Sequence, residues 1–193
     1  MIEHVHTSRG HRGERGASAV EFAIILPVIM VIALGIIEFG NFFTARFIII
    51  NAAREGASLA SRDIQSAQQL ITLMQQAAAP LDLQAKGRIY IKRIRAGQTR
   101  RSPNPTVDTS SSAQAGSLNV PSSVRGSSLG LTSAVYNRLV FDSSPGQMTA
   151  DIGDVTVVEV FYKYIPITPL SSLIPGLLTR DEGGRIMSSR AVF

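Results

Sequence analysis

The sequence predicts an α+β protein in which a long N-terminal helix, hydrophobic enough to cross a membrane, precedes a small antiparallel sheet. Two observations lead to this prediction. Residues 22–37 carry no charged side chain, which is typical of a membrane span. Much farther along the chain, β-branched and aromatic residues alternate with polar ones in residues 88–95 and 154–165, which is the pattern of β-strands.

Residues 17–40 are expected to form the transmembrane helix. A helix of about 20 residues is about 30 Å long, which matches the thickness of the hydrocarbon core of a bilayer. A cleaved secretory signal is the alternative, but such signals have a shorter apolar core followed by small residues. Here the longer apolar run ends at Glu38-Phe39-Gly40, which is a poor cleavage site. The helix is therefore expected to be retained as an anchor.

The orientation of the anchor follows from the leader, residues 1–16. This segment contains Arg9, Arg12 and Arg15. Arginine and lysine residues beside a span favour the cytoplasmic side of the membrane. We therefore expect the N-terminus to lie inside the cell and residues 41–193 to form an extracytoplasmic domain.

Glu21 is the anomaly of the apolar segment. An ionisable side chain within a span is costly and usually has a partner or a purpose. One interpretation is that Glu21 only marks the headgroup boundary. The other depends on its spacing, because Glu21 is the fifth residue after Gly16, which closes the basic leader.

This N-terminal region resembles a known family. The leader ending at Gly16, followed by Ala17, Glu21, Phe22 and the apolar helix, resembles the processing site of type IV prepilins. Several motifs together resemble the TadE-like family, the pseudopilin-like proteins of tight-adherence (Tad or Flp) pilus systems. They are the segment 15–23, the span with Pro27, the triplet 38–40 and the Ala-Ala-Arg-Glu-Gly-Ala block 52–57. The resemblance covers residues 12–62.

The resemblance implies a function and a set of partners. A membrane-embedded prepilin peptidase would cut on the cytoplasmic side between Gly16 and Ala17. The new amine of Ala17 would then pair with the Glu21 carboxylate of a neighbouring subunit. The chain would be a minor pilin or pseudopilin of the bacterial inner membrane or of the pilus. Its partners would be other pilin-like and pilus-assembly proteins.

Beyond the span, the helix is expected to continue to Arg62. Ala52, Gly56 and Ala60 recur every four residues, which forms a stripe of small side chains that lets another helix approach closely. The alternative is that they are ordinary helix formers with a tolerated glycine. Asp63 is expected to cap a second helix that runs through 79 and ends at Pro80.

The remaining chain is expected to form the sheet and its connections. Residues 185–193 give a third strand, 131–140 a short helix, and 167–178 an irregular apolar connection that packs on the sheet. On the second predicted strand, 154–165, Val158, Val160, Tyr162 and Tyr164 share one face. Residues 96–130 are rich in Ser, Gly, Pro, Asn and Thr, so we expect a long exposed loop or a disordered insertion there.

The sequence contains no pattern that predicts catalysis. It has no cysteine, and its histidines, His4, His6 and His11, all lie in the leader, so neither a metal site nor a cofactor is expected. A net charge of +5 over 193 residues is modest and does not by itself indicate a nucleic-acid-binding protein. The basic stretch 86–101 is interpreted as a solvated strand face, or as an attachment surface for anionic partners. The alternative function is therefore an unprocessed, signal-anchored binding module for cell adhesion.

Overall fold

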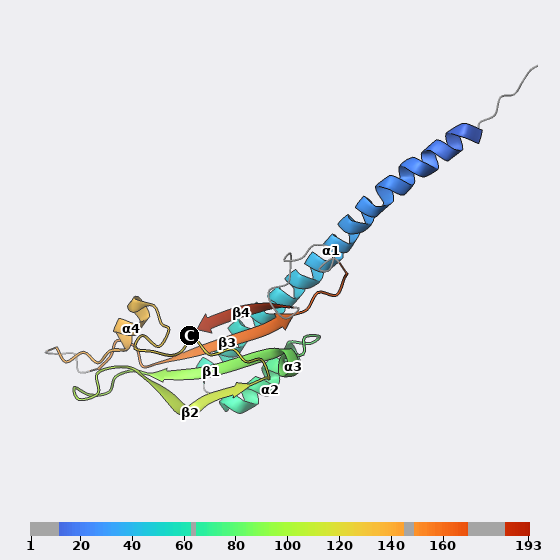
Figure 1. Cartoon of the computed structure of the whole chain (residues 1–193). Coiled ribbons are helices and arrows are strands. Elements are labelled where there is room, and N and C mark those ends of the chain that lie inside the picture. The colour runs from blue at the N-terminus through green and yellow to red at the C-terminus, as the bar shows by residue number, and fades with distance from the viewer. Residues whose placement is uncertain (1–11, 63–64, 145–148, 170–183) are drawn as a thin grey trace, which may run out of the picture.

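The computed structural model describes residues 12–62, 65–144, 149–169 and 184–193. It consists of one long helix, α1 (Arg12–Ser61), and a four-stranded antiparallel sheet packed on its C-terminal half (Figure 1). The predicted α+β arrangement is confirmed. The N-terminal half of α1 extends away from the sheet, so the molecule has an elongated stalk and a packed head.

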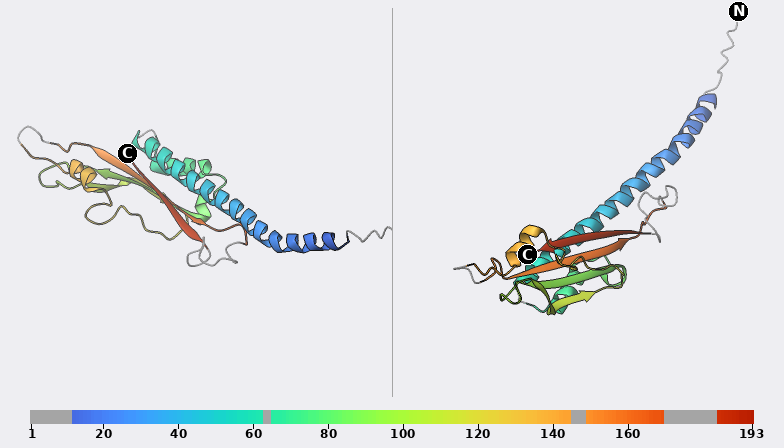
Figure 2. Two further views of the ribbon diagram at one scale, coloured as in Figure 1. Left: turned by 90° about the horizontal axis from the view of Figure 1, so that it is seen from above. Right: turned by 60° about the vertical axis from the view of Figure 1, so that its left-hand side comes forward.

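The helix α1 is continuous over 50 residues, which corresponds to a length of about 75 Å. Pro27 lies inside it. A proline within a helix removes one backbone hydrogen bond and favours a bend. Figure 2 shows α1 bending within the blue N-terminal half that contains this proline. The stalk and the head therefore share one helix, and no linker separates its exposed apolar half from its packed half.

Two shorter helices follow α1. The helix α2 (Ala67–Ala77) begins at Ser66, whose side chain accepts a hydrogen bond from the backbone of Gln69, while the Gln69 side chain accepts one from the Ser66 backbone. This reciprocal pair satisfies two N–H groups at the helix start. Capping by Asp63 was therefore a wrong prediction, and Asp63 itself lies outside the described residues. The helix α3 (Leu83–Lys86) leads directly into the sheet.

The sheet has the strand order β2-β1-β3-β4, with every neighbouring pair antiparallel. Its strands are β1 (Gly87–Arg95), β2 (Thr106–Ala115), β3 (Asp154–Tyr164) and β4 (Arg185–Val192). The strand β3 is buried along nearly all of its length because it is central and covered on both faces. This explains why it is the most apolar of the four.

The main core lies between the C-terminal half of α1 and the inner face of the sheet. On α1 it is lined by small and aliphatic side chains at intervals of four residues, namely Ala45, Ile49, Ala53 and Ala57. The sheet contributes the residues Ile89, Ile91, Val158 and Val160. Alanine at three of the four α1 positions lets the helix lie close to the strands. Each buried aliphatic side chain of the sheet stabilises this contact by about 1.5–3 kcal/mol.

The outer face of the sheet is covered as well. The segment 117–131 and the short helix α4 (Ser133–Leu139) lie over it and form a second core. Val124, Leu131 and Leu139 pack there against Ile94 and Val157. The predicted short helix at 131–140 thus corresponds to α4, and it completes the covering of the outer face.

The segment 96–130 differs from its prediction. It contains β2, and the rest of its second half is anchored to the outer face of the sheet instead of forming a loose loop. The anchor is Glu159, which is only 2 % exposed. Its carboxylate accepts hydrogen bonds from the Ser122 hydroxyl (2.5 Å) and from the Ser123 backbone N–H (3.1 Å) and hydroxyl. Two serines of this Ser-rich segment thus serve as hydrogen-bond donors to a buried carboxylate.

Candidate functional site: the anchor helix and its junction with the sheet

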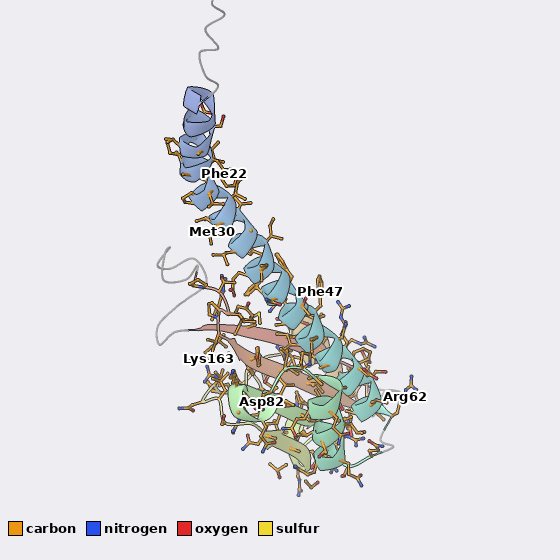
Figure 3. All side chains as sticks on the ribbon, turned by 90° about the vertical axis from the view of Figure 1, so that its right-hand side faces the viewer. Phe22, Met30, Phe47, Arg62, Asp82 and Lys163 are labelled. Carbon is orange, nitrogen blue, oxygen red and sulfur yellow. The ribbon has the colours of Figure 1, made fainter. Side chains whose placement is uncertain are left out.

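The N-terminal half of α1 has exposed apolar side chains on all sides. The side chains of Phe22 (60 % exposed) and Met30 (55 %) project from the part of the helix that lies clear of the sheet (Figure 3). Among the described residues, α1 is the one helix long and apolar enough to cross a membrane. A soluble protein does not leave an apolar surface of this size in water, so this half of α1 is suited to a lipid environment.

The predicted processing site lies at the start of this exposed half. Gly16, Ala17, Glu21 and Phe22 are all exposed on α1. A Cβ atom placed on Gly16 would have no atom within 4 Å. Ala17 and Glu21 are four residues apart, so their side chains lie on one face of the helix. Within the described part of the chain, no side chain pairs with Glu21. A partner for its carboxylate would have to come from outside this part of the chain.

The stripe of small residues on α1 lies against α2 of the same chain. Ala52 and Gly56 are buried, and Ala60 is partly buried. A Cβ atom on Gly56 would lie 2.5 Å from the sulfur of Met74 on α2. The glycine therefore leaves room for the Met74 side chain. The helix that approaches this stripe closely is α2.

Sequence reasoning did not identify Glu38 as a site residue, although the structure makes it the centre of the junction. Glu38 is 0 % exposed. Its carboxylate accepts hydrogen bonds from the Tyr164 hydroxyl (2.5 Å), the Ile167 N–H (3.1 Å), and the N–H and hydroxyl of Thr168 (2.7 Å each). A buried carboxylate is very costly unless several donors surround it, and these four groups meet that requirement.

Tyr164 joins the end of β3 to α1. Its ring packs edge-to-face on Phe42 with centroids 5.3 Å apart. Burial, and then the hydrogen bond to Glu38, raise the pKa of the Tyr164 hydroxyl above its usual value of 10. The hydroxyl therefore stays protonated and remains a donor at any physiological pH. The only sequence signal for this contact was the triplet Glu38-Phe39-Gly40. The triplet does not indicate which residue binds Glu38.

Comparison with known proteins bears on this same helix. Residues 16–58 match the model of the TadE-like protein family. The resemblance read from the sequence motifs is confirmed over this range. Neither a curated protein nor a solved structure gives a significant match to the chain.

The TadE-like segment lies entirely within α1. It begins at Gly16 and includes Glu21, the junction residue Glu38 and the buried Gly56. It therefore includes both the exposed half of the helix and most of the half that packs on the sheet. Because Glu38 is buried by the β3 end, the head contacts α1 before residue 41, the position where the extracytoplasmic domain was expected to start.

Several cations of the basic stretch 86–101 are engaged within the chain itself. Arg93 lies 2.9 Å from Asp154, and Arg95 lies 2.7 Å from Asp108. Arg88 donates a hydrogen bond to the Gly116 carbonyl (2.6 Å). These cations contact acids and carbonyls that the sheet brings beside them from distant parts of the chain. This favours a structural role for the stretch over an attachment surface for anionic partners.

The described residues contain no group of three or more His, Cys, Asp or Glu side chains placed to hold a metal ion. The leader histidines lie outside the described residues. In the part of the chain that the structure describes, the sites that stand out are the exposed anchor with Glu21 and the buried junction at Glu38. Both belong to α1. The first lies on its exposed apolar half, and the second connects this helix to the end of β3.

Proposed function

We propose that this protein is a pilin-like subunit, a minor pilin or pseudopilin, that acts in the assembly of a tight-adherence type IV pilus. It resides in the bacterial cytoplasmic membrane with its N-terminus inside the cell. The observation that supports this most directly is Glu21, an exposed carboxylate that has no partner among the described residues, on the apolar half of a TadE-like helix. A helix that served only as an anchor would not need this residue.

Processing by prepilin peptidase after Gly16 is the first step of the proposed function. The family match begins at this glycine, and the open space around its backbone leaves room for a protease. The cut would remove the basic leader and create a cationic amine on Ala17. The apolar helix would stay attached to the head.

Assembly is the second step. At the centre of a membrane-spanning helix a charged side chain costs about 2.5–3.5 kcal/mol on insertion scales, and near the end of the span, where Glu21 lies, it costs less. Pairing Glu21 with the Ala17 amine of a neighbouring pilin-like subunit would remove this cost and set the register of the two helices. The exposed apolar side chains around Glu21 would supply the packing surface. Because α1 continues into the head without a linker, a fixed helix register would also fix the position of the head.

The experiment compares Glu21→Ala, Glu21→Gln and Glu21→Asp in the native cell at equal membrane levels. We expect Glu21→Ala and Glu21→Gln to insert and be cut, but to lose surface pili and co-purification with pilin-like partners. Glu21→Asp should retain part of both. Glu55→Gln is the matched control, because Glu55 is an exposed glutamate of the same helix beyond the span.

Unchanged pili in Glu21→Ala would contradict the assembly role. The N-terminal residue of the protein in its native membrane tests the processing step separately. Intact mass that still includes Met1, in a strain with active prepilin peptidase, would favour the signal-anchored adhesion module instead.

A further inference from the structure

We propose that the β3–β4 end of the head rests on the lipid bilayer through the exposed side chains of Ile165, Ile167 and Ile186, with Arg185 beside the lipid phosphates. This inference depends only on the N-terminal half of α1 crossing the membrane. It does not require cleavage at Gly16 or assembly into a pilus.

The position of this surface is fixed by the junction at Glu38. Glu38 directly follows Ile37, the last residue of the uncharged run that would lie in the membrane. Its carboxylate binds the backbone N–H groups of Ile167 and Thr168. Residues 167 and 168 therefore lie at the level where α1 leaves the hydrocarbon core. Figure 1 shows the C-terminal end of β3 directed toward the exposed half of α1.

The side chains at this end are apolar and exposed. Ile167 is 72 % exposed, Ile186 is 51 % and Ile165 is 43 %. In the sheet register Ile186 lies opposite Lys163. Figure 3 shows Lys163 at the other end of the head from Arg62, which follows the last residue of α1. The sequence had predicted that the 167–178 connection packs on the sheet. The first residue of this connection, Ile167, is exposed instead of packed, and 170–178 lie outside the described residues.

Single exposed isoleucines are common on soluble proteins and need no explanation. Here three of them occupy the end of the head that the anchor holds against the membrane. An apolar side chain at that level can enter the boundary between headgroups and acyl chains, where its transfer from water is favourable. The same isoleucines at the far end of the head would have no such environment.

The charge at this end also fits a lipid surface. Arg185 is exposed, next to Ile186, and its guanidinium carbon lies 5.9 Å from the ring centre of Phe42. This places a cation close to α1 just beyond the junction. Arginine at this level can bind lipid phosphate while its stem lies along apolar surface. A basic side chain beside exposed apolar ones is the composition of an interfacial membrane contact.

The test uses the absence of cysteine from the chain, which allows labelling at one chosen position. Ile167→Cys in the full-length protein is labelled with an environment-sensitive fluorophore and reconstituted into nanodiscs of mixed zwitterionic and anionic lipid. Some of the lipids carry a spin-label quencher near the headgroup. Ile165→Cys is the second probe position, which keeps the test valid if one variant is poorly folded.

Leu73→Cys is the matched control. Leu73 is an apolar residue with 41 % exposure on α2, beside the part of α1 around Gly56. That part of α1 lies about 27 Å beyond Glu38 along the helix axis. We expect a blue-shifted emission and severalfold stronger lipid quenching at positions 167 and 165 than at 73. Replacing Arg185 with Gln should reduce the quenching at 167 in anionic nanodiscs more than in zwitterionic ones.

Two results would overturn the proposal. Equal quenching at 167, 165 and 73 would show that this end of the head stays in water. A blue shift at 167 without lipid quenching would show that another protein surface covers it. Neither result bears on pilus assembly, because the nanodisc contains only the purified chain. Loss of pili in Glu21→Ala would likewise leave this test unaffected.

Discussion

The Tyr164 hydroxyl donates a 2.5 Å hydrogen bond to the Glu38 carboxylate and thereby joins two residues that are 126 positions apart in the chain. Glu38 belongs to the TadE-like segment, whereas Tyr164 ends the central strand β3. The contact connects the anchor helix to the last strands of the sheet at the point where the helix leaves its apolar half. The orientation of the head relative to the anchor therefore depends on this buried carboxylate.

Glu38→Ala should destabilise the head by about 3 kcal/mol, because it leaves three buried donors and the partly buried Ile167 N–H without their carboxylate acceptor. Tyr164→Phe removes one donor to a charged group and should cost about 1.5–3 kcal/mol. The measurement is urea unfolding of the full-length protein in detergent, followed by circular dichroism. Glu55→Ala is the control, since this exposed glutamate lies on the same helix. Equal midpoints for Glu38→Ala and Glu55→Ala would refute the role of the junction.

Glu159→Gln should release the segment 117–131 from the outer face of the sheet. The neutral amide is a weaker acceptor, and its NH2 group would face the hydroxyl and N–H donors of Ser122 and Ser123. Hydrogen exchange measured by mass spectrometry should become faster in 117–131, while that of β1 and β3 changes little. Ser127→Ala, a change at an exposed serine of the same segment, serves as the control. Unchanged exchange in Glu159→Gln would show that the apolar contacts and the other hydrogen bonds of the segment, such as that from the Tyr90 hydroxyl to the Val120 carbonyl, hold it without Glu159.

Gly56→Leu should destabilise the packing of α2 on α1 by about 1–3 kcal/mol, because the new side chain would occupy the place of Met74. Gly40→Leu is the matched change on the same helix, where a Cβ atom meets nothing within 4 Å. That substitution should be neutral, or stabilising by about 0.5–1 kcal/mol through helix propensity. Thermal unfolding of both variants in the same detergent gives the comparison. Similar melting temperatures would contradict the packing role of Gly56.

Asp108 should make the stability of the head depend on pH in the acid range. Hydrogen bonds from Ser110, together with Arg95 nearby, lower the pKa of this carboxyl from 3.8 to about 2. Because the folded-state pKa is the lower one, the stabilisation is complete above pH 3.8 and disappears as the pH falls to about 2. Asp108→Asn should therefore unfold at lower urea than the wild type at pH 7. The difference should close between about pH 4 and pH 2, and a gap that stays constant with pH would contradict this assignment.

Local patterns in the sequence were sufficient to predict several elements. The uncharged run 22–37 predicts the exposed half of α1, because crossing a bilayer requires a continuous apolar helix and little else. Alternation in 154–165 predicts β3 and places Val158 and Val160 on the face that forms the core with α1. In each case the property that decides the structure is local: a continuous apolar run or an alternation between neighbouring residues. It can therefore be predicted without knowing which distant residues make contact.

The Ser-rich segment shows where this reasoning ends. Its composition predicts a loop or disorder because it has few apolar residues to bury. In the structure two of its serines, Ser122 and Ser123, are donors to Glu159, which comes from a strand formed later in the chain. Polar residues become ordered when a buried acceptor meets them, and composition contains no information about that acceptor. Capping of α2 by Ser66 instead of Asp63 is a smaller example.

The sequence by itself therefore determined the exposed apolar half of α1, the strands of the inner core and the resemblance of residues 16–58 to the TadE-like family, since each rests on local periodicity or on a local motif. Only the tertiary structure decided what Glu38 does. A glutamate at the end of an apolar run can mark a membrane boundary or contact a distant strand. The local sequence around it is the same in both cases. The difference arises because Tyr164, Ile167 and Thr168 reach it from the other end of the chain, and burial then makes these hydrogen bonds necessary.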